Sequence, residues 1–159
     1  MTVYVNPANE VGDGISIKKW TGYANLIYDE TAVNTYQLGD QKKPDIALLN
    51  NGNAVIVWES HYDNSGTHSY NIFGKTLDVE AWTFSEEFLV SFFSEKEQTL
   101  PTVCGLQSGG FLVAWNSYGQ DRTNKWSIWA KRYNFSRINM GNAFLLVNSQ
   151  NDQSQQISL

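Results

Sequence analysis

The chain has 159 residues, a length that fits one domain able to bury a hydrophobic core without disulfide or metal support. Aromatic residues make up 14% and charged residues only 17% of the sequence, which favours β structure. The net charge of −5, with no lysine and arginine cluster beyond isolated pairs, excludes a nucleic-acid-binding surface, because phosphate contacts need clustered positive charge.

Strand-like segments recur along the chain in units of about 55 residues. The first unit, residues 1–40, is partial, and residues 2–6 can serve as its second strand. The second unit, residues 41–97, is predicted to form strands at about 44–49, 54–60, 70–77 and 87–93. The third unit, residues 98–152, is predicted to form strands at about 101–106, 111–117, 126–133 and 143–148. Residues 153–159 look like the first strand of a further unit.

Glycine turns and polar loops separate these strands. Asn50-Asn51-Gly52 and the segment 107–110 are typical of tight hairpin turns between a first and a second strand. Longer polar loops, at 61–69 and 118–125, separate the second strand from the third. No segment shows the apolar period of 3.6 that a helix requires, so we expect helix to be absent or minor.

The repeat rests on matched residues at constant spacing. A Q-x-x-P motif begins at Gln41 and again at Gln98, and a tryptophan follows each glutamine by 17 residues, at Trp58 and Trp115. Chance does not produce such a pair of spacings, so the repeat is a strong signal.

The second half of the unit occurs three times. Residues 15–41 align with 72–98 without a gap, and residues 128–153 align with a difference of one residue. The alignment matches three lysines and three Val-polar pairs: Lys18, Lys75 and Lys131, and then Val33-Asn34, Val90-Ser91 and Val147-Asn148.

The apolar runs 54–58, 111–115 and 144–147 are continuous rather than alternating, which indicates burial on both faces of a sheet. Blades of a β-propeller are sandwiched in this way between their neighbours. We therefore expect an all-β fold of about three four-stranded antiparallel blades, with a β-prism or a β-trefoil as the alternative.

About three blades do not close a propeller, which has about four to eight. An open array presents unpaired strand edges, and such edges promote association. We therefore expect a homo-oligomer or packing against neighbouring repeats of a longer array.

Several segments resemble tandem repeats of large bacterial and protist surface or secreted proteins: Gln98-x-x-Pro101-x-Val103, Gly109 to Asp121, and Ile128 to Asn134. Those repeats read Q-x-x-P-x-V, then G-G-F-V-V-x-W-x-S-x-G-x-D, then I-Y-A-Q-R-Y, then E-F-x-V-N. The resemblance covers nearly the whole chain and is clearest in residues 98–148. It implies propeller-blade-like architecture and an extracellular or cell-surface location, in a family mostly without assigned activity.

Candidate ligand-binding residues lie in the loops between the second and third strands. Aromatic rings beside polar loops can stack on sugar rings, while Asn, Asp and Gln bond hydroxyl groups. The candidates are Tyr118, Gln120, Asp121 and Trp126 in the third unit, and Tyr62, Asp63 and Asn64 in the second. A loop packed by its own aromatic side chains accounts for the same residues.

We expect neither a metal nor another cofactor. His61, Asp63 and His68 share one loop, but the matching loop of the third unit repeats none of them. Each loop has one carboxylate where a calcium loop needs several, so ordinary turn chemistry accounts for Asp63 and Asp121.

No catalytic constellation is evident, so an enzyme is not expected. Both histidines lie in one polar loop, and the adjacent carboxylates of Glu86 and Glu87 face opposite sides of a strand. Trp58 and Trp115 are predicted to pack in the core, and Cys104 is predicted to be a small buried residue. No run of 18 apolar residues occurs, so we expect no membrane insertion.

The sequence thus favours a non-enzymatic binding or structural repeat module that acts through self-association or a surface partner. The alternative is a carbohydrate-binding lectin with sites in the loops between strands two and three. A glycoside-acting enzyme of propeller type is the third hypothesis.

Overall fold

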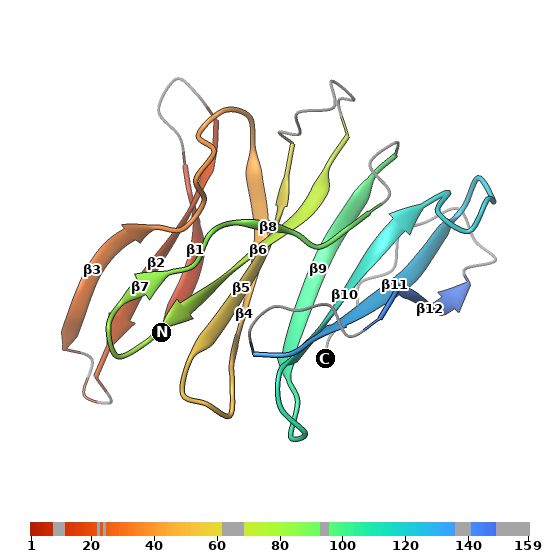
Figure 1. The fold of residues 1–159 in the computed structure, drawn as a ribbon. Helices are drawn as coiled ribbons and strands as arrows, with labels where there is room; N and C mark the ends of the chain where they lie inside the picture. The colour runs from red at the N-terminus through yellow and green to blue at the C-terminus, as the bar shows by residue number, and fades with distance from the viewer. Residues whose placement is uncertain are drawn as a thin grey trace.

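The computed structural model describes residues 1–7, 12–21, 23, 25–61, 69–92, 96–135 and 141–148. These residues form twelve strands joined by turns, and no helix occurs among them. The strands make three antiparallel sheets that stand side by side in chain order (Figure 1). The prediction of an all-β fold is therefore confirmed. The described part contains no helix of the length and apolarity needed to cross a membrane.

Each sheet is built from strands that follow one another in the chain. The first sheet has the order β1 (Thr2–Asn6), β2 (Gly14–Trp20) and β3 (Leu26–Ala32). The second has the order β4 (Gln41–Leu48), β5 (Ala54–Ser60), β6 (Asn71–Asp78) and β7 (Thr83–Phe84), and β8 (Phe88–Leu89) also pairs with β6. The third has the order β9 (Gln98–Gly105), β10 (Phe111–Tyr118), β11 (Trp126–Tyr133) and β12 (Phe144–Asn148).

The middle strands of each unit lie where the sequence predicts them, and the first strands begin earlier. β5 covers the predicted 54–60 and β11 the predicted 126–133. β4 and β9 begin at Gln41 and Gln98, three residues before the prolines that we expected to open them.

The Q-x-x-P motif forms an irregular start to β4 and β9. The residues before the two prolines, Lys43 and Leu100, have positive φ angles of 49° and 51°. The pairing with the second strand shifts register at this point in both sheets. A bulge of this kind accommodates a proline, which has no N–H for the strand ladder. The prediction missed these strand starts because a proline reads as a strand boundary.

The fourth strand of the middle sheet is split into β7 and β8, which both pair with β6. Between them, Ser85 stays attached to β6: its N–H donates to the carbonyl oxygen of Thr76 and its hydroxyl accepts from the N–H of Thr76. In place of the single strand predicted at about 87–93, the structure therefore has two short strands, one before this range and one within it.

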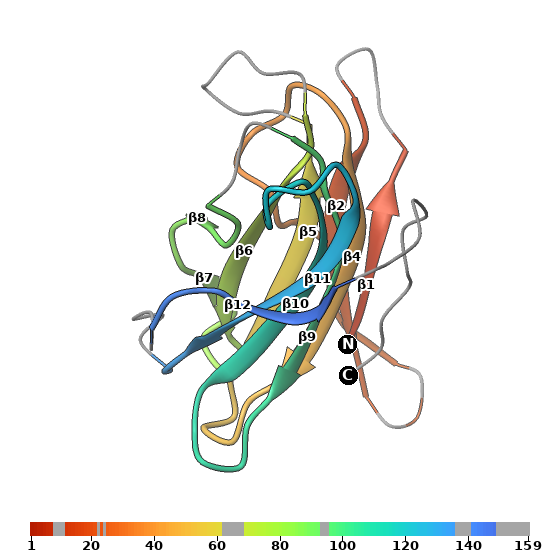
Figure 2. The ribbon, with the colours of Figure 1, turned by 90° about the vertical axis from the view of Figure 1, so that its right-hand side faces the viewer.

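Two hydrophobic cores fill the spaces between the sheets. Every residue of β5 is buried, and its side chains alternate between the two cores. Ala54, Ile56 and Trp58 pack against the first sheet, whereas Val55 and Val57 pack against the third. Seen from the end of the third sheet, the three sheets lie one behind another (Figure 2). The continuous apolar run of β5 therefore reflects burial on both faces of the middle sheet.

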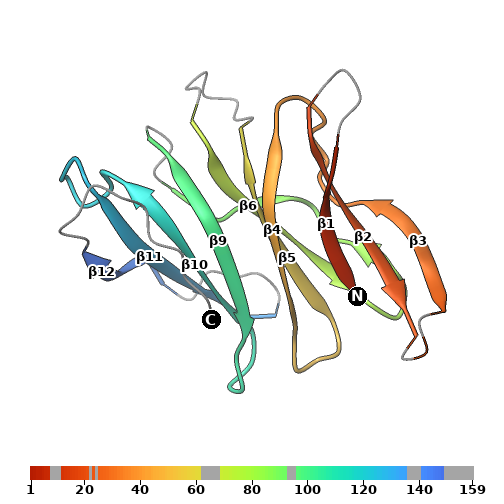
Figure 3. The same cartoon turned by 180° about the vertical axis from the view of Figure 1, so that it is seen from behind.

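The first strands of the second and third sheets approach each other closely. The carboxylate of Asp45 in β4 accepts hydrogen bonds of 2.8 Å from the hydroxyl of Thr102 and the N–H of Val103 in β9. A Cβ atom on Gly105 would lie 2.5 Å from the carbonyl oxygen of Leu48, so a larger residue does not fit there. β1, β4 and β9 thus line one side of the array (Figure 3).

Cys104 is half-buried, which corrects the prediction that it is a buried residue. It pairs with Leu112 across β9 and β10, whereas Phe111 and Val113 point into the core. Directly paired residues share one face of a sheet. Cys104 therefore lies on the outer face of the third sheet, which no other sheet of the described residues covers.

Candidate functional site

The loop between β10 and β11 contains four of the predicted ligand-binding residues. Tyr118 ends β10 and Trp126 begins β11, directly opposite each other. Their rings meet edge to face with centroids 5.4 Å apart. The ammonium group of Lys96 lies 5.4 Å from the centroid of the Tyr118 ring and donates a hydrogen bond of 3.0 Å to Asn124. The two aromatic residues thus pack on each other at the base of the loop, and Lys96 links the loop to the segment before β9.

Gln120 and Asp121 make contacts within the same loop. The Ser117 hydroxyl donates to Oε1 of Gln120 at 3.0 Å. Oδ1 of Asp121 accepts from the N–H and the hydroxyl of Thr123 at 3.1 and 2.6 Å. This is the turn chemistry expected of an aspartate. Oδ2 of Asp121 is shielded from solvent and has no hydrogen-bond partner among the described residues.

The corresponding candidates of the second unit, Tyr62, Asp63 and Asn64, lie outside the described residues, as does His68. His61 packs its ring against Tyr70, with centroids 5.1 Å apart. Within the described ranges, no three His, Cys, Asp or Glu side chains gather in a way that could hold a metal ion.

A buried hydrogen bond between glutamine and tryptophan joins the first and second strands of two sheets. The indole N–H of Trp58 donates to Oε1 of Gln41 at 3.2 Å, and that of Trp115 donates to Oε1 of Gln98 at 3.0 Å. None of the four side chains is more than 1% exposed. The tryptophans are therefore core residues, as predicted, and the 17-residue spacing reflects a cross-strand pair.

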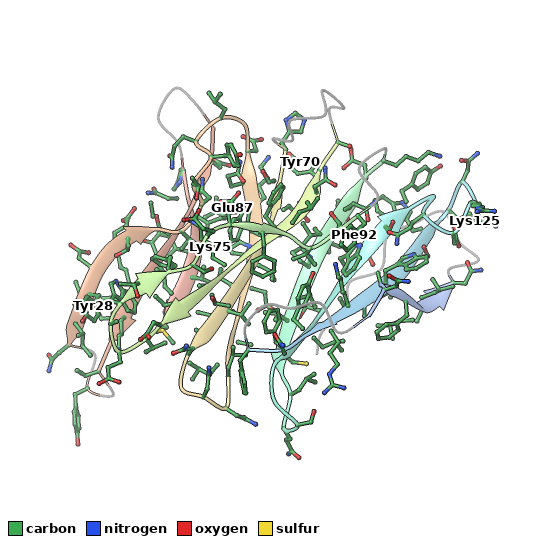
Figure 4. All side chains as sticks on the ribbon, in the orientation of Figure 1. Tyr28, Tyr70, Lys75, Glu87, Phe92 and Lys125 are labelled. Atoms are coloured by element: carbon green, nitrogen blue, oxygen red, sulfur yellow. The ribbon has the colours of Figure 1, made fainter. Side chains whose placement is uncertain are left out.

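Two of the aligned lysines are buried between sheets. The ammonium group of Lys75 on β6 donates a hydrogen bond of 2.7 Å to the carbonyl oxygen of Val33, which follows the first sheet. The ammonium group of Lys131 on β11 lies 3.3 Å from the centroid of the Phe92 ring, which follows the second sheet. Lys75 and Phe92 mark these two junctions in Figure 4. Each lysine thus reaches back to the segment that leaves the preceding sheet.

Burial also changes the titration of both lysines. It lowers the pKa of Lys75, and it lowers the pKa of Lys131 to about 8. The two side chains are 8% and 1% exposed. Desolvation disfavours the charged form of a lysine, so these residues belong to the packed junctions rather than to the solvated surface.

The aligned valines differ in burial along the chain. The N–H of Val33 donates to the carbonyl oxygen of Ile15, and that of Val90 to Ile72, both at 2.8 Å. Val33 and Val90 are fully buried, whereas Val147 in β12 is 44% exposed. The next sheet covers the first two valines, and no sheet among the described strands covers the third.

Tyr4 in the first sheet holds the position that Trp58 holds in the second. The aligned lysines show this: Lys18 pairs with Thr2, and Lys75 pairs with Ile56. Tyr4 lies two residues after Thr2, and Trp58 lies two residues after Ile56. The hydroxyl of Tyr4 is shielded from solvent, and the side chains of Glu30 and Lys18 lie beside it.

Lys18 shares the outer face of the first sheet with Tyr4. The adjacent residues Ile17 and Val3 point into the core, and successive strand residues face opposite sides. The ammonium group of Lys18 lies 3.6 Å and 3.8 Å from the carboxylates of Asp29 and Glu30. The sequence alignment matches Lys18 with Lys75 and Lys131 and assigns these lysines no role; their matched positions in the repeat are the signal for one.

Glu59 is a carboxylate within the junction of the second and third sheets. Its side chain is almost fully buried and accepts a hydrogen bond of 2.6 Å from the N–H of Leu100 in the β9 bulge. Burial raises the pKa of this carboxyl group. Its contact joins β5 to β9.

Comparison with protein-family models and with curated proteins finds no match to this chain.

Proposed function

We propose that this chain is a non-enzymatic structural and binding module of blade-like sheets that associates with further copies of itself through its end sheets. One contrast carries the proposal. β5 is buried on both faces between neighbouring sheets, whereas Phe144, Leu145, Leu146 and Val147 of β12 are 41–45% exposed.

The exposed apolar residues of β12 follow one another along an edge strand, and Phe144 and Val147 share the outer face of the third sheet. Single exposed apolar side chains are common on soluble proteins, but a contiguous apolar patch marks an interaction surface. Phe144 and Val147 pair with Ala130 and Ile128 on the outer face of the third sheet, whereas Leu145 pairs with Trp129 on the face turned toward the core. A further sheet stacked against this end would cover Phe144 and Val147, as the third sheet covers the middle one.

Two copies would supply enough sheets for a closed ring. Each chain contributes three sheets, and a ring of about six blades falls within the range of about four to eight that closes. Closed symmetry is the usual state of assemblies of identical chains. Such a ring leaves no exposed sheet face at either end.

The molar mass in solution tests this proposal. Light scattering on a size-exclusion column is expected to give twice the 18.0 kDa of one chain. A mass of one chain at all concentrations, unchanged when residues 153–159 are deleted, would contradict it.

Carbohydrate binding at the β10–β11 loop is the second candidate. It is favoured by the rings of Tyr118 and Trp126, which meet edge to face at the base of this polar loop. Aromatic rings of this kind can stack on sugar rings. A glycan array should then show binding that Asp121→Asn and Trp126→Ala abolish. Equal signals from the variants and the wild type would remove this candidate.

A further inference from the structure

A junction between neighbouring sheets occurs twice inside the chain and joins a lysine, its lysine half, to a valine segment, its valine half. The two ends of the array carry one half each. In the first internal junction, Lys75 of the second sheet binds the carbonyl oxygen of Val33, and Val33 is fully buried. In the second, Lys131 of the third sheet reaches the segment of Val90 and Phe92, and Val90 is fully buried. Each junction therefore joins a lysine on one sheet to the valine segment that follows the preceding sheet.

The first sheet presents the lysine half of this junction on its outer face. Lys18 occupies the place of Lys75, and its side chain keeps 29% exposure. Tyr4 occupies the place of Trp58 beside it, and its hydroxyl is shielded from solvent. In the other two sheets, the side chain at this place donates to a glutamine of the first strand.

The third sheet presents the valine half at the opposite end. Val147 occupies the place of Val33 and Val90, and it is 44% exposed where they are fully buried. The two halves lie at opposite ends of the array (Figure 1), so one chain of three sheets in this arrangement does not bring them together.

We infer that a second copy of this chain docks head to tail, with the β12 end of one copy against the β1–β2 face of the other. This inference rests on the proposed self-association and specifies its interface. Lys18 of one copy donates to the carbonyl oxygen of Val147 of the other, as Lys75 does to Val33.

The contacts favour this polarity over a symmetric face-to-face pair. Two β12 ends placed together would bring Val147 against Val147 and supply no lysine for either carbonyl group. Two β1–β2 faces placed together would supply no valine carbonyl group for either Lys18. Head-to-tail docking instead repeats a packing that the chain already uses twice.

Two charge-altering variants, one for each half, test the interface. Lys18→Glu blocks the lysine half and Val147→Asp blocks the valine half, while each leaves the other half intact. Matched controls are Lys42→Glu, which changes another surface lysine paired with an aspartate, and Leu48→Asp, which changes another exposed apolar strand residue. Circular dichroism and melting curves establish that all four variants fold. If Val147→Asp melts well below Leu48→Asp, Val147→Thr provides a milder second variant.

Light scattering and native mass spectrometry give the readout. Lys18→Glu and Val147→Asp alone are each expected to show a loss of the two-chain ring, and both controls should keep it. A one-to-one mixture of the two variants should restore a species of two chains, because each contributes the half that the other has lost.

The outcomes separate this inference from the proposed function. If the wild-type protein is a single chain, both are wrong. If the wild type associates but the two variants associate equally well, or if their mixture restores nothing, only the head-to-tail interface is wrong. Loss of association in Val147→Asp alone would show a symmetric β12 contact and would also overturn the head-to-tail interface.

Discussion

The indole N–H of Trp115 donates a hydrogen bond of 3.0 Å to the side-chain oxygen of Gln98, and both side chains are fully buried. The same pair recurs as Trp58 and Gln41 at 3.2 Å. A buried donor without an acceptor is costly, so this bond favours one register between the first and second strands. It gives the two matched residues a structural role.

Replacing Trp115 with alanine should strongly destabilise the fold. The side chain fills the core between the second and third sheets, and emptying a buried aromatic site costs about 3–5 kcal/mol. Urea unfolding followed by tryptophan fluorescence measures this change. An unchanged free energy of unfolding would show that Trp115 lies on the surface.

Gln98 and Trp115 should be energetically coupled. Gln98→Ala leaves the buried indole N–H without its acceptor, and we expect a cost of about 1–3 kcal/mol. In a Trp115→Phe background that donor is absent, so Gln98→Ala should cost less. A double-mutant cycle in urea measures the coupling energy, expected at about 0.5–3 kcal/mol. Strictly additive effects would show that the hydrogen bond contributes nothing to stability.

Lys75→Met should destabilise the junction between the first and second sheets. Methionine keeps much of the apolar stem but leaves the carbonyl oxygen of Val33 without its lysine donor, which costs about 1–3 kcal/mol. Lys42→Met is the control, because Lys42 forms a surface ion pair with Asp40 and should change stability by about 1 kcal/mol or less. Equal melting temperatures of Lys75→Met and the wild type would argue against the junction role.

Glu59 should make stability fall as pH rises. Burial raises its pKa above the ordinary 4.5, so between that value and the raised pKa the folded state binds more protons than the unfolded state. The free energy of unfolding therefore decreases as pH increases through this window.

Glu59→Gln should remove this pH dependence, because its amide oxygen can still accept the N–H of Leu100. Urea unfolding from about pH 4 to about pH 7 compares the slopes, with the exposed Glu80→Gln as control. Identical slopes for the wild type and Glu59→Gln would contradict the effect of burial.

Chelation should leave the melting temperature unchanged. Oδ1 of Asp121 already bonds the N–H and the hydroxyl of Thr123, and a calcium loop needs several oxygen ligands. Differential scanning fluorimetry with and without EDTA measures this. A drop in melting temperature that calcium restores would identify a metal site in these loops.

Several features of the fold follow from local pattern and could be predicted. The strands at 54–60 and 126–133 and the two-sided burial of β5 agree with the sequence prediction, because continuous apolar runs and turn residues are local signals. Two-sided burial was also expected of the run 144–147, and that prediction is wrong because all four of its residues are exposed on the edge strand β12. The core position of Trp115 also agrees, since it ends such a run.

The environment of each repeated residue depended on the tertiary structure. Val33, Val90 and Val147 are equivalent in sequence, yet the first two are fully buried and the third is 44% exposed. Cys104 lies in an apolar stretch but is half-buried because it faces the outer side of the third sheet. Local pattern determined the strands and the repeat of this chain. Only the stacking of sheets decided which copies of a residue are buried, because burial depends on the neighbour that covers a side chain.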